Sequence, residues 1–557
     1  MKRCPECRRD YHDDSLIYCL EDGAALVSGV PDEPATAILN SEAPTRVHSA
    51  ETSSPSDPVA TTAENFASSR RLVMAGVLGV LLVAAIGIGA YWFYDKRTGK
   101  QINSIAVMPF VNESGNPEFE YVSDGVTEEL ISSLTRLPGL TVKPRSTIIR
   151  YKGQNTDAKT LGSALGVGAI LNGSVAQRGD EVALHVELVD ATTDSVLWSD
   201  DYRKPLAALA TLHSEIARDI SNQLRAKLSS SDQQRLVRKY TDNAEAYQLY
   251  RKGRFHWNKS TREDVQRSTE YYRQAIDLDP NYALAYSGLA DAYMNLPGYD
   301  RTVTPRETLP KAREYTLKAL SLDDSLSEAH VAMGRVLMYH DHDFAGAERE
   351  LKRAIELDTN NAFAFHSYGG LLTGLGRRDE AEANFKRAIQ LEPESPGIVR
   401  AYSFLLMVAR RYDEAEAQLK KAIDLEPNRA VTYYSLCTLY LLRAKYADSV
   451  EACARAREMN GKPEAASAMR ETFAKASFKE FVRGLADDRW PVAGNIAYIY
   501  ATYFVILGEK ERALDKLERA YEDREGFMPM INVDPRFDGL RDEPRFKELI
   551  RKVGLSP

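Results

Sequence analysis

Hydrophobic residues follow a different pattern in each part of the 557-residue chain, and the longest apolar run lies at residues 72–94. This run contains no charged residue, and Tyr91, Trp92 and Tyr94 lie at its end. As an α-helix it would extend about 34 Å, enough to cross a hydrocarbon core of about 30 Å with its aromatic residues at the headgroups. The pattern therefore predicts one transmembrane helix within residues 70–96.

Between residues 101 and 230, short apolar runs alternate with helical patterns. Residues 105–110 are typical of a buried strand, and residues 181–190 alternate between apolar and polar positions as a half-buried strand does. Apolar residues recur at helical spacing between and after these runs, and a long helix is predicted at residues 206–228. These elements predict an α/β domain at residues 101–230 with the order β-α-β-α-β-β-β-α.

Beyond residue 241 one helical pattern recurs along the chain. The segment AIDLDP at residues 275–280 returns in related forms that begin at residues 319, 354, 388 and 422. The last two steps are 34 residues each, which is the period of the tetratricopeptide repeat (TPR) family, and the chain resembles that family here. In such arrays each helical hairpin buries its apolar faces only against its neighbours. We therefore expect an all-α TPR solenoid at residues 241–525, with a C-terminal cap at residues 526–557.

Composition and charge narrow the classes of partner. Hydrophobic residues make up 44% and charged residues 27% of the chain, which are ordinary values for globular domains. The net charge of −8 argues against a protein that holds nucleic acid by counterion release, so no nucleic-acid partner is expected. Residues 28–69 are rich in Ser, Thr, Pro, Ala and Glu and have few apolar groups to bury, so they are predicted to form a disordered linker.

Three of the five cysteines occur near the N-terminus, in a spacing that suits a metal. A C-x-x-C turn is followed by a second, incomplete turn in which an aspartate stands where a full zinc ribbon has a cysteine. Residues 1–27 resemble the short zinc-ribbon segment at the start of many bacterial membrane-anchored proteins. We expect a structural zinc (Zn) here, and water or His12 are alternatives to the aspartate as its fourth ligand. The predicted ligands are Cys4, Cys7, Cys19 and Asp22.

The α/β segment also carries a family resemblance. The residues that match lie at 105–110, 121–125, 170–175 and 188–190. They resemble the N-terminal domain of the periplasmic protein TolB and of its relatives among curli-secretion and flagellar lipoproteins. In that family the domain is a non-catalytic assembly module, so the resemblance implies an interaction role for residues 101–230.

No catalytic constellation is recognisable in the sequence. Glu128 and Glu129 are interpreted as part of a solvated helix face, and His213 has no nucleophile or acid that spacing would bring to it. Cys437 and Cys453 occupy core positions of one repeat and are interpreted as separate buried thiols rather than a disulfide. We therefore predict that the protein is not an enzyme and has no small-molecule substrate.

The resemblance to TPR proteins implies a binding surface on the concave face, which the first helix of each repeat forms. A groove of this kind accepts a protein or peptide ligand. Placing the repeats in register points six side chains, mostly arginine and aromatic, toward this face, and such side chains are common in interface hot spots. Packing between repeats is the alternative role for each of them. The six residues are Arg335, Phe363, His366, Arg400, Phe404 and Tyr434.

Together these expectations describe a multidomain membrane protein with a zinc-ribbon-like knot, one transmembrane (TM) helix, a TolB N-terminal-like α/β domain and a TPR solenoid. Zinc thiolates persist in a reducing compartment, so the N-terminus is expected in the cytosol. The span then lies in the inner (cytoplasmic) membrane, with the α/β and TPR domains on the extracytoplasmic side. The predicted function is a membrane-anchored, non-catalytic scaffold that binds protein partners through both domains. The alternative is a sensory or regulatory membrane protein that signals through the zinc-ribbon segment.

Overall fold

The computed structural model describes residues 102–557 except positions 136, 138, 155, 225–239, 260, 301–302 and 491–495, together with three short strands near the N-terminus. Contacts divide the chain into two units, Met1–Tyr94 and Asp95–Pro557. The short strands belong to the first unit and form an antiparallel sheet in the order β2-β1-β3. They are β1 (Lys2–Arg3), β2 (Asp10–Tyr11) and β3 (Val27–Ser28).

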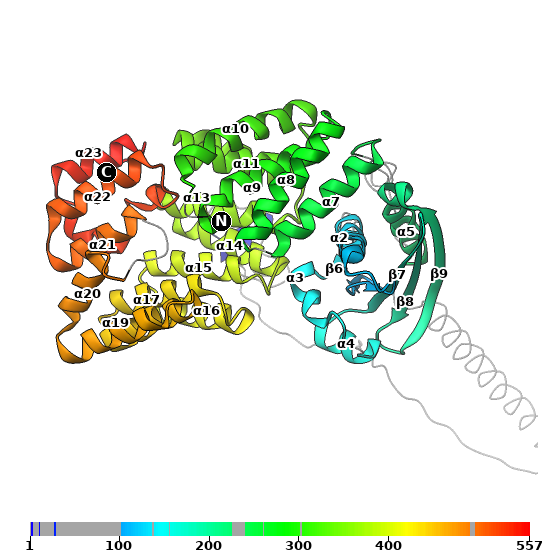
Figure 1. Cartoon of the computed structure of the whole chain (residues 1–557), viewed down its shortest axis with the longest axis horizontal. Coiled ribbons are helices and arrows are strands. Elements are labelled where there is room, and N and C mark those ends of the chain that lie inside the picture. Colours follow the sequence, from blue (N-terminus) through cyan, green and yellow to red (C-terminus); the bar gives the residue numbers. More distant parts are fainter. Residues whose placement is uncertain are drawn as a thin grey trace, which may run out of the picture. The chain divides into compact units, whose positions relative to one another are not determined.

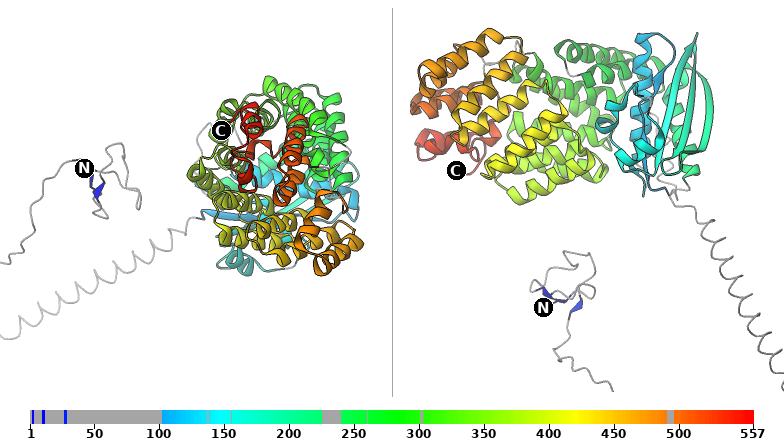
Figure 2. Two further views of the ribbon diagram at one scale, coloured as in Figure 1. Left: turned by 90° about the vertical axis from the view of Figure 1, so that its left-hand side faces the viewer. Right: turned by 90° about the horizontal axis from the view of Figure 1, so that it is seen from below.

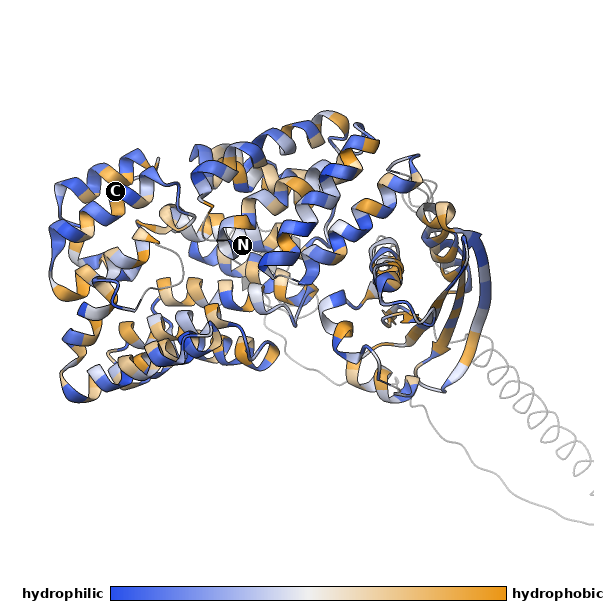
Figure 3. Ribbon diagram, viewed as in Figure 1, coloured by the Kyte–Doolittle hydropathy of each residue, from blue (hydrophilic) through white to orange (hydrophobic). Residues whose placement is uncertain are grey.

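The prediction of a membrane-spanning fold class is corrected by the structure. Within the described part of the chain, no helix is both long and apolar enough to cross a bilayer, and residues 72–94 lie outside that part. Figure 3 shows polar and apolar residues mixed along many of the described helices, as expected where one side of a helix packs on a neighbouring helix. The fold class is therefore an α/β domain followed by an all-helical array, and the assignment to the inner membrane is withdrawn.

The structure does not support the zinc-ribbon part of the predicted fold class either. All four predicted ligands, Cys4, Cys7, Cys19 and Asp22, lie outside the described residues. Within the described residues, no group of three or more His, Cys, Asp or Glu side chains could hold a metal ion.

The α/β domain is built on a mixed sheet with the strand order β6-β4-β7-β8-β9, in which β5 also pairs with β7 (Figure 1). Strand β4 is parallel to β6 and β7, whereas β7, β8 and β9 form an antiparallel meander. The strands predicted at residues 105–110 and 181–190 are present as β4 and β8. The strands are β4 (Ser104–Val107), β5 (Val111–Asn112), β6 (Thr141–Val142), β7 (Ala169–Arg178), β8 (Glu181–Asp190) and β9 (Ser195–Pro205).

Helices cover both faces of this sheet. On one face Leu130 and Ile216 are fully buried against the strands, and on the other face Leu161 packs in a cluster with Ile170. Gly173 is required on β7 because a Cβ atom there would lie 2.2 Å from the ring of Phe110. The helices of this domain are α2 (Glu120–Thr135), α3 (Arg145–Ile148), α4 (Ala158–Leu165) and α5 (Leu209–Gln223).

The rest of the described chain is helical and folds as antiparallel pairs that stack in sequence order (Figure 1, Figure 2). This confirms the predicted array of helical hairpins. The first helices of the pairs are α7 (Ala244–Lys259), α9 (Ala283–Tyr299), α11 (Ser327–Val336), α13 (Ala362–Gly374), α15 (Pro396–Val408), α17 (Ala430–Leu442), α19 (Pro463–Lys475) and α21 (Ala497–Leu507). The second helices are α8 (Arg262–Leu278), α10 (Pro305–Leu322), α12 (Phe344–Leu357), α14 (Arg378–Leu391), α16 (Tyr412–Leu425), α18 (Tyr446–Met459), α20 (Phe478–Ala486) and α22 (Lys510–Glu522).

A repeated polar clamp joins successive pairs beside their apolar core. Glu382 on α14 accepts hydrogen bonds from Tyr402 Oη at 2.8 Å and from Arg411 Nη1 at 2.6 Å. The hydrogen bond from Arg411 is the main reason that the pKa of Glu382 is lowered to about 2. The same arrangement recurs one repeat earlier, with Glu348, Tyr368 and Arg377.

We expect the Glu382→Gln substitution to remove part of the acid sensitivity of the chain. A carboxyl group whose pKa is lowered in the folded state stabilises that state above its unfolded pKa of 4.5, and this contribution is lost as the pH falls toward 2. Because the clamp is partly exposed to solvent, its contribution is about 1 kcal/mol. The variant will be less stable than the wild type by about that amount at pH 7 and equally stable near pH 2, in urea unfolding followed by circular dichroism.

The matched control is Glu356→Gln, which changes an exposed pair with Arg353 on the second helix α12. It will leave stability unchanged at both pH values, since exposed pairs contribute little. A loss of stability in the Glu382 variant that is the same at both pH values would contradict the electrostatic account.

The C-terminal segment packs along the turns of earlier pairs and does not simply cap the last one. Arg524 Nη1 donates a hydrogen bond to Nδ1 of His342 at 3.0 Å, and Arg410 pairs with Asp538. At Gly374, a Cβ atom would lie 2.8 Å from the carbonyl oxygen of the tail residue Pro529. The turn residues come from three successive helix pairs, so the tail lies along one edge of the array. Its last helix is α23 (Pro544–Lys552).

Cys437 on α17 and Cys453 on α18 form a disulfide, with their Cα atoms 5.3 Å apart. This corrects the prediction of two separate thiols. Both residues are buried, as predicted, but they occupy facing core positions of the same hairpin. Sequence spacing identifies core positions without showing which of them meet across a helix pair.

Candidate functional site

The predicted partner-binding residues lie on four successive first helices. Arg335 belongs to α11, Phe363 and His366 to α13, Arg400 and Phe404 to α15, and Tyr434 to α17. These helices contact one another in order along the array. The repeat register read from the sequence therefore assigns all six residues to first helices.

Arg335 is held in place by the preceding first helix. Its Nη1 donates a hydrogen bond to Asp291 Oδ1 at 2.9 Å, and its Nη2 donates one to Asn295 Oδ1 at 3.0 Å. Its guanidinium also lies over the ring of Phe363, with Cζ 5.0 Å from the ring centroid. The charge of Arg335 is thus matched by Asp291, while Phe363 remains 38% exposed beside it.

His366 lies one turn along α13 from Phe363. Its ring stacks on Phe363 at 5.4 Å and meets the edge of Phe385 at 6.0 Å. Burial, followed by the positive charges of Arg335 and Arg400, lowers the pKa of His366 to about 3. Its Nδ1 atom is buried and has no hydrogen-bond partner among the described residues. His366 is therefore a neutral, polar group at neutral pH.

Arg400 differs from Arg335 in the strength of its pairing, because the nearby carboxylate of Glu426 faces it without forming an ion pair with it. Within the described chain its guanidinium makes no ion pair and no side-chain hydrogen bond, although the residue is half-buried. Burial, and then the charge of nearby Arg429, lower the pKa of Arg400, and the negative charge of Glu426 opposes them in part. Arg429 itself lies 3.6 Å from Glu426 and over the ring of Tyr299. We call Arg335, Phe363, His366 and Arg400 the first-helix cluster.

Among the described residues, no hydrogen bond, ion pair or ring contact joins Phe404 or Tyr434 to the first-helix cluster. Phe404 packs against the hydrophobic core of the array. Tyr434 Oη accepts a hydrogen bond from Asn460 Nδ2 at 3.1 Å and lies beside Arg457, whose Cζ is 5.7 Å from its ring centroid. Packing between repeats thus accounts for the contacts of these two residues, while Arg335, Phe363 and His366 are joined by contacts of their own.

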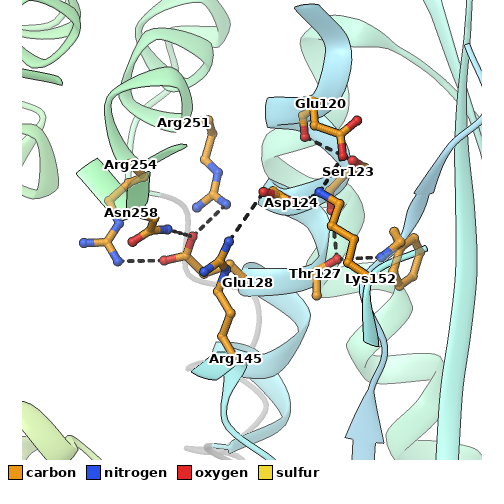
Figure 4. A network of polar contacts seen from close by, with 11 residues as sticks. Glu120, Ser123, Asp124, Thr127, Glu128, Arg145, Lys152, Arg251, Arg254 and Asn258 are labelled. Atoms are coloured by element: carbon orange, nitrogen blue, oxygen red, sulfur yellow. Dashed lines mark hydrogen bonds and ion pairs between the residues drawn. The ribbon is translucent and has the colours of Figure 1, made fainter. Parts of the chain in front are cut away.

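A second polar cluster, which the sequence did not reveal, lies between the α/β domain and the first repeat (Figure 4). Glu128 on α2 accepts a hydrogen bond from Arg254 Nη2 at 2.6 Å and lies 3.5 Å from Arg251 Nη2. Both arginines belong to α7. Glu129 accepts a hydrogen bond from Arg251 Nη1 at 3.1 Å and lies 3.1 Å from Nε2 of His213 on α5. We call these five residues the junction cluster.

The junction cluster corrects two interpretations made from the sequence. Glu128 and Glu129 do not form a solvated face, and His213 is not isolated, because all three side chains are largely enclosed between the two domains. Burial raises the pKa of Glu128, but the charges of Arg254 and Arg251 outweigh it and lower the pKa to about 2. Both arginines lie on α7, the first helix of the first repeat, and no spacing rule identifies carboxylates on another domain as their partners.

The junction leaves a small cavity and depends on a glycine. The cavity has a volume of about 140 Å³ and is lined by residues of the junction cluster and by tyrosines of the first two repeats, including Tyr247 and Tyr282. A Cβ atom at Gly125 on α2 would lie 2.9 Å from Nε of Arg251, so glycine lets the guanidinium approach the helix. The α/β domain is thereby attached to the array by buried charge pairs.

Two further contacts attach the α/β domain to later repeats. Asn360 Nδ2, in the turn before α13, donates a hydrogen bond to the carbonyl oxygen of Thr135 at 3.0 Å. Arg150 Nη2 forms an ion pair with Glu394, in the turn before α15, at 2.8 Å. The α/β domain therefore contacts the array at the first repeat and at two turns that adjoin the helices of the first-helix cluster.

Parts of the chain are similar to known families. Residues 100–218 match the family described as HilA/YgeH-like transcriptional regulator, second domain, and residues 372–431 match the tetratricopeptide repeat family. A curated relative, a putative adenylate cyclase 3 of Rhizobium meliloti (strain 1021), is 31% identical over 240 residues. The aligned part is 42% of this chain and 40% of that protein, so the chain spans less than half the length of this relative.

Solved structures of TPR proteins resemble parts of the array. A thermophilic TPR protein of Thermus thermophilus is 21% identical and covers 35% of this chain and 99% of its own, with a TM-score of 0.30. YrrB, described as a TPR protein with an unusual peptide-binding site, is 20% identical and covers 36% of this chain and 99% of its own, with a TM-score of 0.25. The family match at residues 372–431 and the observed helix pairs support TPR repeats in the helical array.

Proposed function

We propose that the protein is a non-catalytic scaffold that binds a segment of a partner protein on the first-helix face of its TPR array. The observation that carries the proposal is the first-helix cluster, in which the guanidinium of Arg335 on one first helix and the ring of His366 on the next lie against the exposed ring of Phe363. Arginine and aromatic side chains supply most of the binding energy in protein interfaces.

A non-catalytic role is supported by the state of the buried carboxylates in the described residues. Glu128 and Glu129 are paired with arginines of the first repeat, and their pKa values are lowered. A general base works best with a pKa near the operating pH, so these carboxylates are poorly suited to proton transfer. Their pairing instead supports a structural role in joining the two domains.

For the α/β domain we propose an interaction role. The resemblance to the TolB N-terminal domain and the match to a transcriptional-regulator domain both concern this segment. Its firm attachment to the first repeat means that a partner bound to the α/β domain and a partner bound to the array would be held in a defined geometry.

A regulatory role is the second candidate, and the names of the related proteins favour it. The matched family is described as a transcriptional regulator, and the matched curated protein as a putative adenylate cyclase. A regulator must transmit binding from the array to the α/β domain, whereas a scaffold need not. Hydrogen exchange of α2 with and without a bound peptide separates the two, since a change in protection at α2 supports regulation and unchanged protection supports a scaffold.

We expect peptides selected on the full chain from a random display library to depend on Phe363. The Phe363→Ala variant will bind them about 10-fold or more weakly, because truncating an aromatic hot spot costs about 2 kcal/mol. The control is Leu317→Ala on the second helix α10, which is 45% exposed and lies away from the first-helix face. Fluorescence anisotropy measures both affinities. If no peptide is enriched, or if both variants bind alike, the proposed face is wrong.

A further inference from the structure

Strand β9 forms one edge of the sheet of the α/β domain (Figure 1). It pairs with β8 along its length, and within the described part of the chain no strand lies on its other side. Most of its side chains are exposed. A long strand with an unpaired edge presents a row of backbone donors and acceptors to which another strand can add.

The pairing of β8 with β9 shows which amides of β9 face the free edge. Just beyond the paired strands, Leu206 N donates a hydrogen bond to the carbonyl oxygen of Asp180 at 2.9 Å. Hydrogen-bonded pairs alternate along an antiparallel ladder, so the even-numbered residues from 200 to 204 bond to β8 and the odd-numbered residues from 199 to 205 face outward. In agreement, the N–H of Asp201 donates a hydrogen bond to Oδ1 of Asp200 at 2.8 Å.

The charges along β9 have an order that is complementary to itself, in the segment Asp200-Asp201-Tyr202-Arg203-Lys204. Two copies of the strand can run antiparallel about a two-fold axis at Tyr202. Asp201 then faces Arg203 of the second copy, and Asp200 faces Lys204 in the same way. Opposite charges in directly facing positions stabilise a strand pair, whereas like charges destabilise it.

This register also suits the backbone. It places odd-numbered residues opposite one another, so the outward amides and carbonyls of Asp201 and Arg203 can bond across the axis. Moving the axis to either neighbouring residue brings two aspartates or two arginines face to face, which is unfavourable. Charged side chains protect an edge strand from pairing with other strands, but their order here permits one register with a second copy.

The facing side chains are accessible for these pairs. The side chain of Asp201 is 76% exposed, and it contacts His185 at 3.0 Å. Lys204 is partly exposed and pairs with Glu215 at the surface. Arg203 is exposed and forms no ion pair with any residue that the structure describes. Exposed pairs of this kind contribute little to the monomer, so they can be exchanged for contacts with a second copy at small cost.

We propose that the chain forms a homodimer in which the β9 edges of two copies pair antiparallel, with Asp201 of each copy facing Arg203 of the other. The sheets of the two copies then become one continuous sheet. The pairing also brings the exposed Val196 and Leu197 alongside the turn that follows β9 in the second copy. This inference is independent of what the first-helix face binds, and it places two such faces in one assembly.

Sedimentation equilibrium of the full chain measures the dissociation constant of the dimer. Asp201→Arg and Arg203→Asp each create two like-charge contacts across the axis, and each will raise the dissociation constant about 10-fold or more. The double variant Asp201→Arg/Arg203→Asp reverses both charges and will restore the constant to within about three-fold of the wild-type value. Only facing residues can compensate each other in this way.

The matched control is Lys159→Glu on α4, which changes the net charge by the same amount as Arg203→Asp at an exposed helix position. It will leave the dissociation constant unchanged. A wild type that remains monomeric would overturn the inference. A dimer that the single variants do not weaken, or that the double variant does not restore, would overturn it as well, because its interface would then lie elsewhere.

Discussion

Replacement of Arg251 by methionine is expected to lower the free energy of unfolding by about 3–5 kcal/mol, because it leaves buried carboxylates without their counter-ion. Arg251 is 7% exposed and contacts both Glu128 and Glu129. Arg254 pairs only with Glu128, and His213 lies against Glu129. Urea unfolding of the full chain, followed by circular dichroism, measures the loss.

The matched controls identify the cause of this effect. Arg353→Met removes an exposed arginine and is expected to change stability by no more than about 0.5 kcal/mol. Adding Glu129→Gln to Arg251→Met removes one unpaired charge and will restore part of the lost stability. Hydrogen exchange will locate the loss at α2 and α7, the two helices that the ion pairs join. If Arg251→Met is as stable as the wild type, the junction cluster does not hold the domains together.

Loss of the disulfide between Cys437 and Cys453 is the second large effect that we expect. A disulfide restricts the unfolded chain, and the two cysteines are separated by 16 residues in the sequence. For a loop of about that length the contribution to the free energy of unfolding is about 3 kcal/mol. The double variant Cys437→Ala/Cys453→Ala will therefore unfold at lower urea concentration than the oxidised wild type. The two sulfurs lie 16 residues apart in sequence and link the helices of one hairpin, so the change will be greatest in α17 and α18.

A reducing agent provides the control for the disulfide. Treatment with a phosphine reductant will destabilise the wild type by a similar amount and will have no effect on the double variant. Titration of thiols in unfolded, unreduced protein checks the bond directly. If Cys437 and Cys453 both react as free thiols there, the disulfide is absent and the stability difference will vanish.

The repeat array could be predicted from the sequence to the level of individual helices. The 34-residue step and the apolar positions at helical spacing defined the hairpins, because burial of one helix face leaves a local, periodic record in the chain. The same register assigned Arg335, Phe363, His366 and Arg400 to first helices, as the structure has them. The α/β domain was likewise visible as alternating strands and helices.

The candidate site could be predicted only in part. Phe404 and Tyr434 lie on first helices as expected, yet their contacts are with the core and with Asn460 and Arg457. The register places a residue on a helix, but the side chains that approach it come from other repeats. Whether Arg400 meets a counter-ion therefore could not be read from its position.

By itself the sequence determined which segments become strands and helices and which helix faces are buried, because these depend on residues close together in the chain. Tertiary structure alone decided what each buried face meets. Glu128 and Arg254 are 126 residues apart and form one ion pair, and two core cysteines of one hairpin turn out to face each other. Charge pairing acts over a few ångströms in space, whatever the distance along the chain, so no local pattern encodes it.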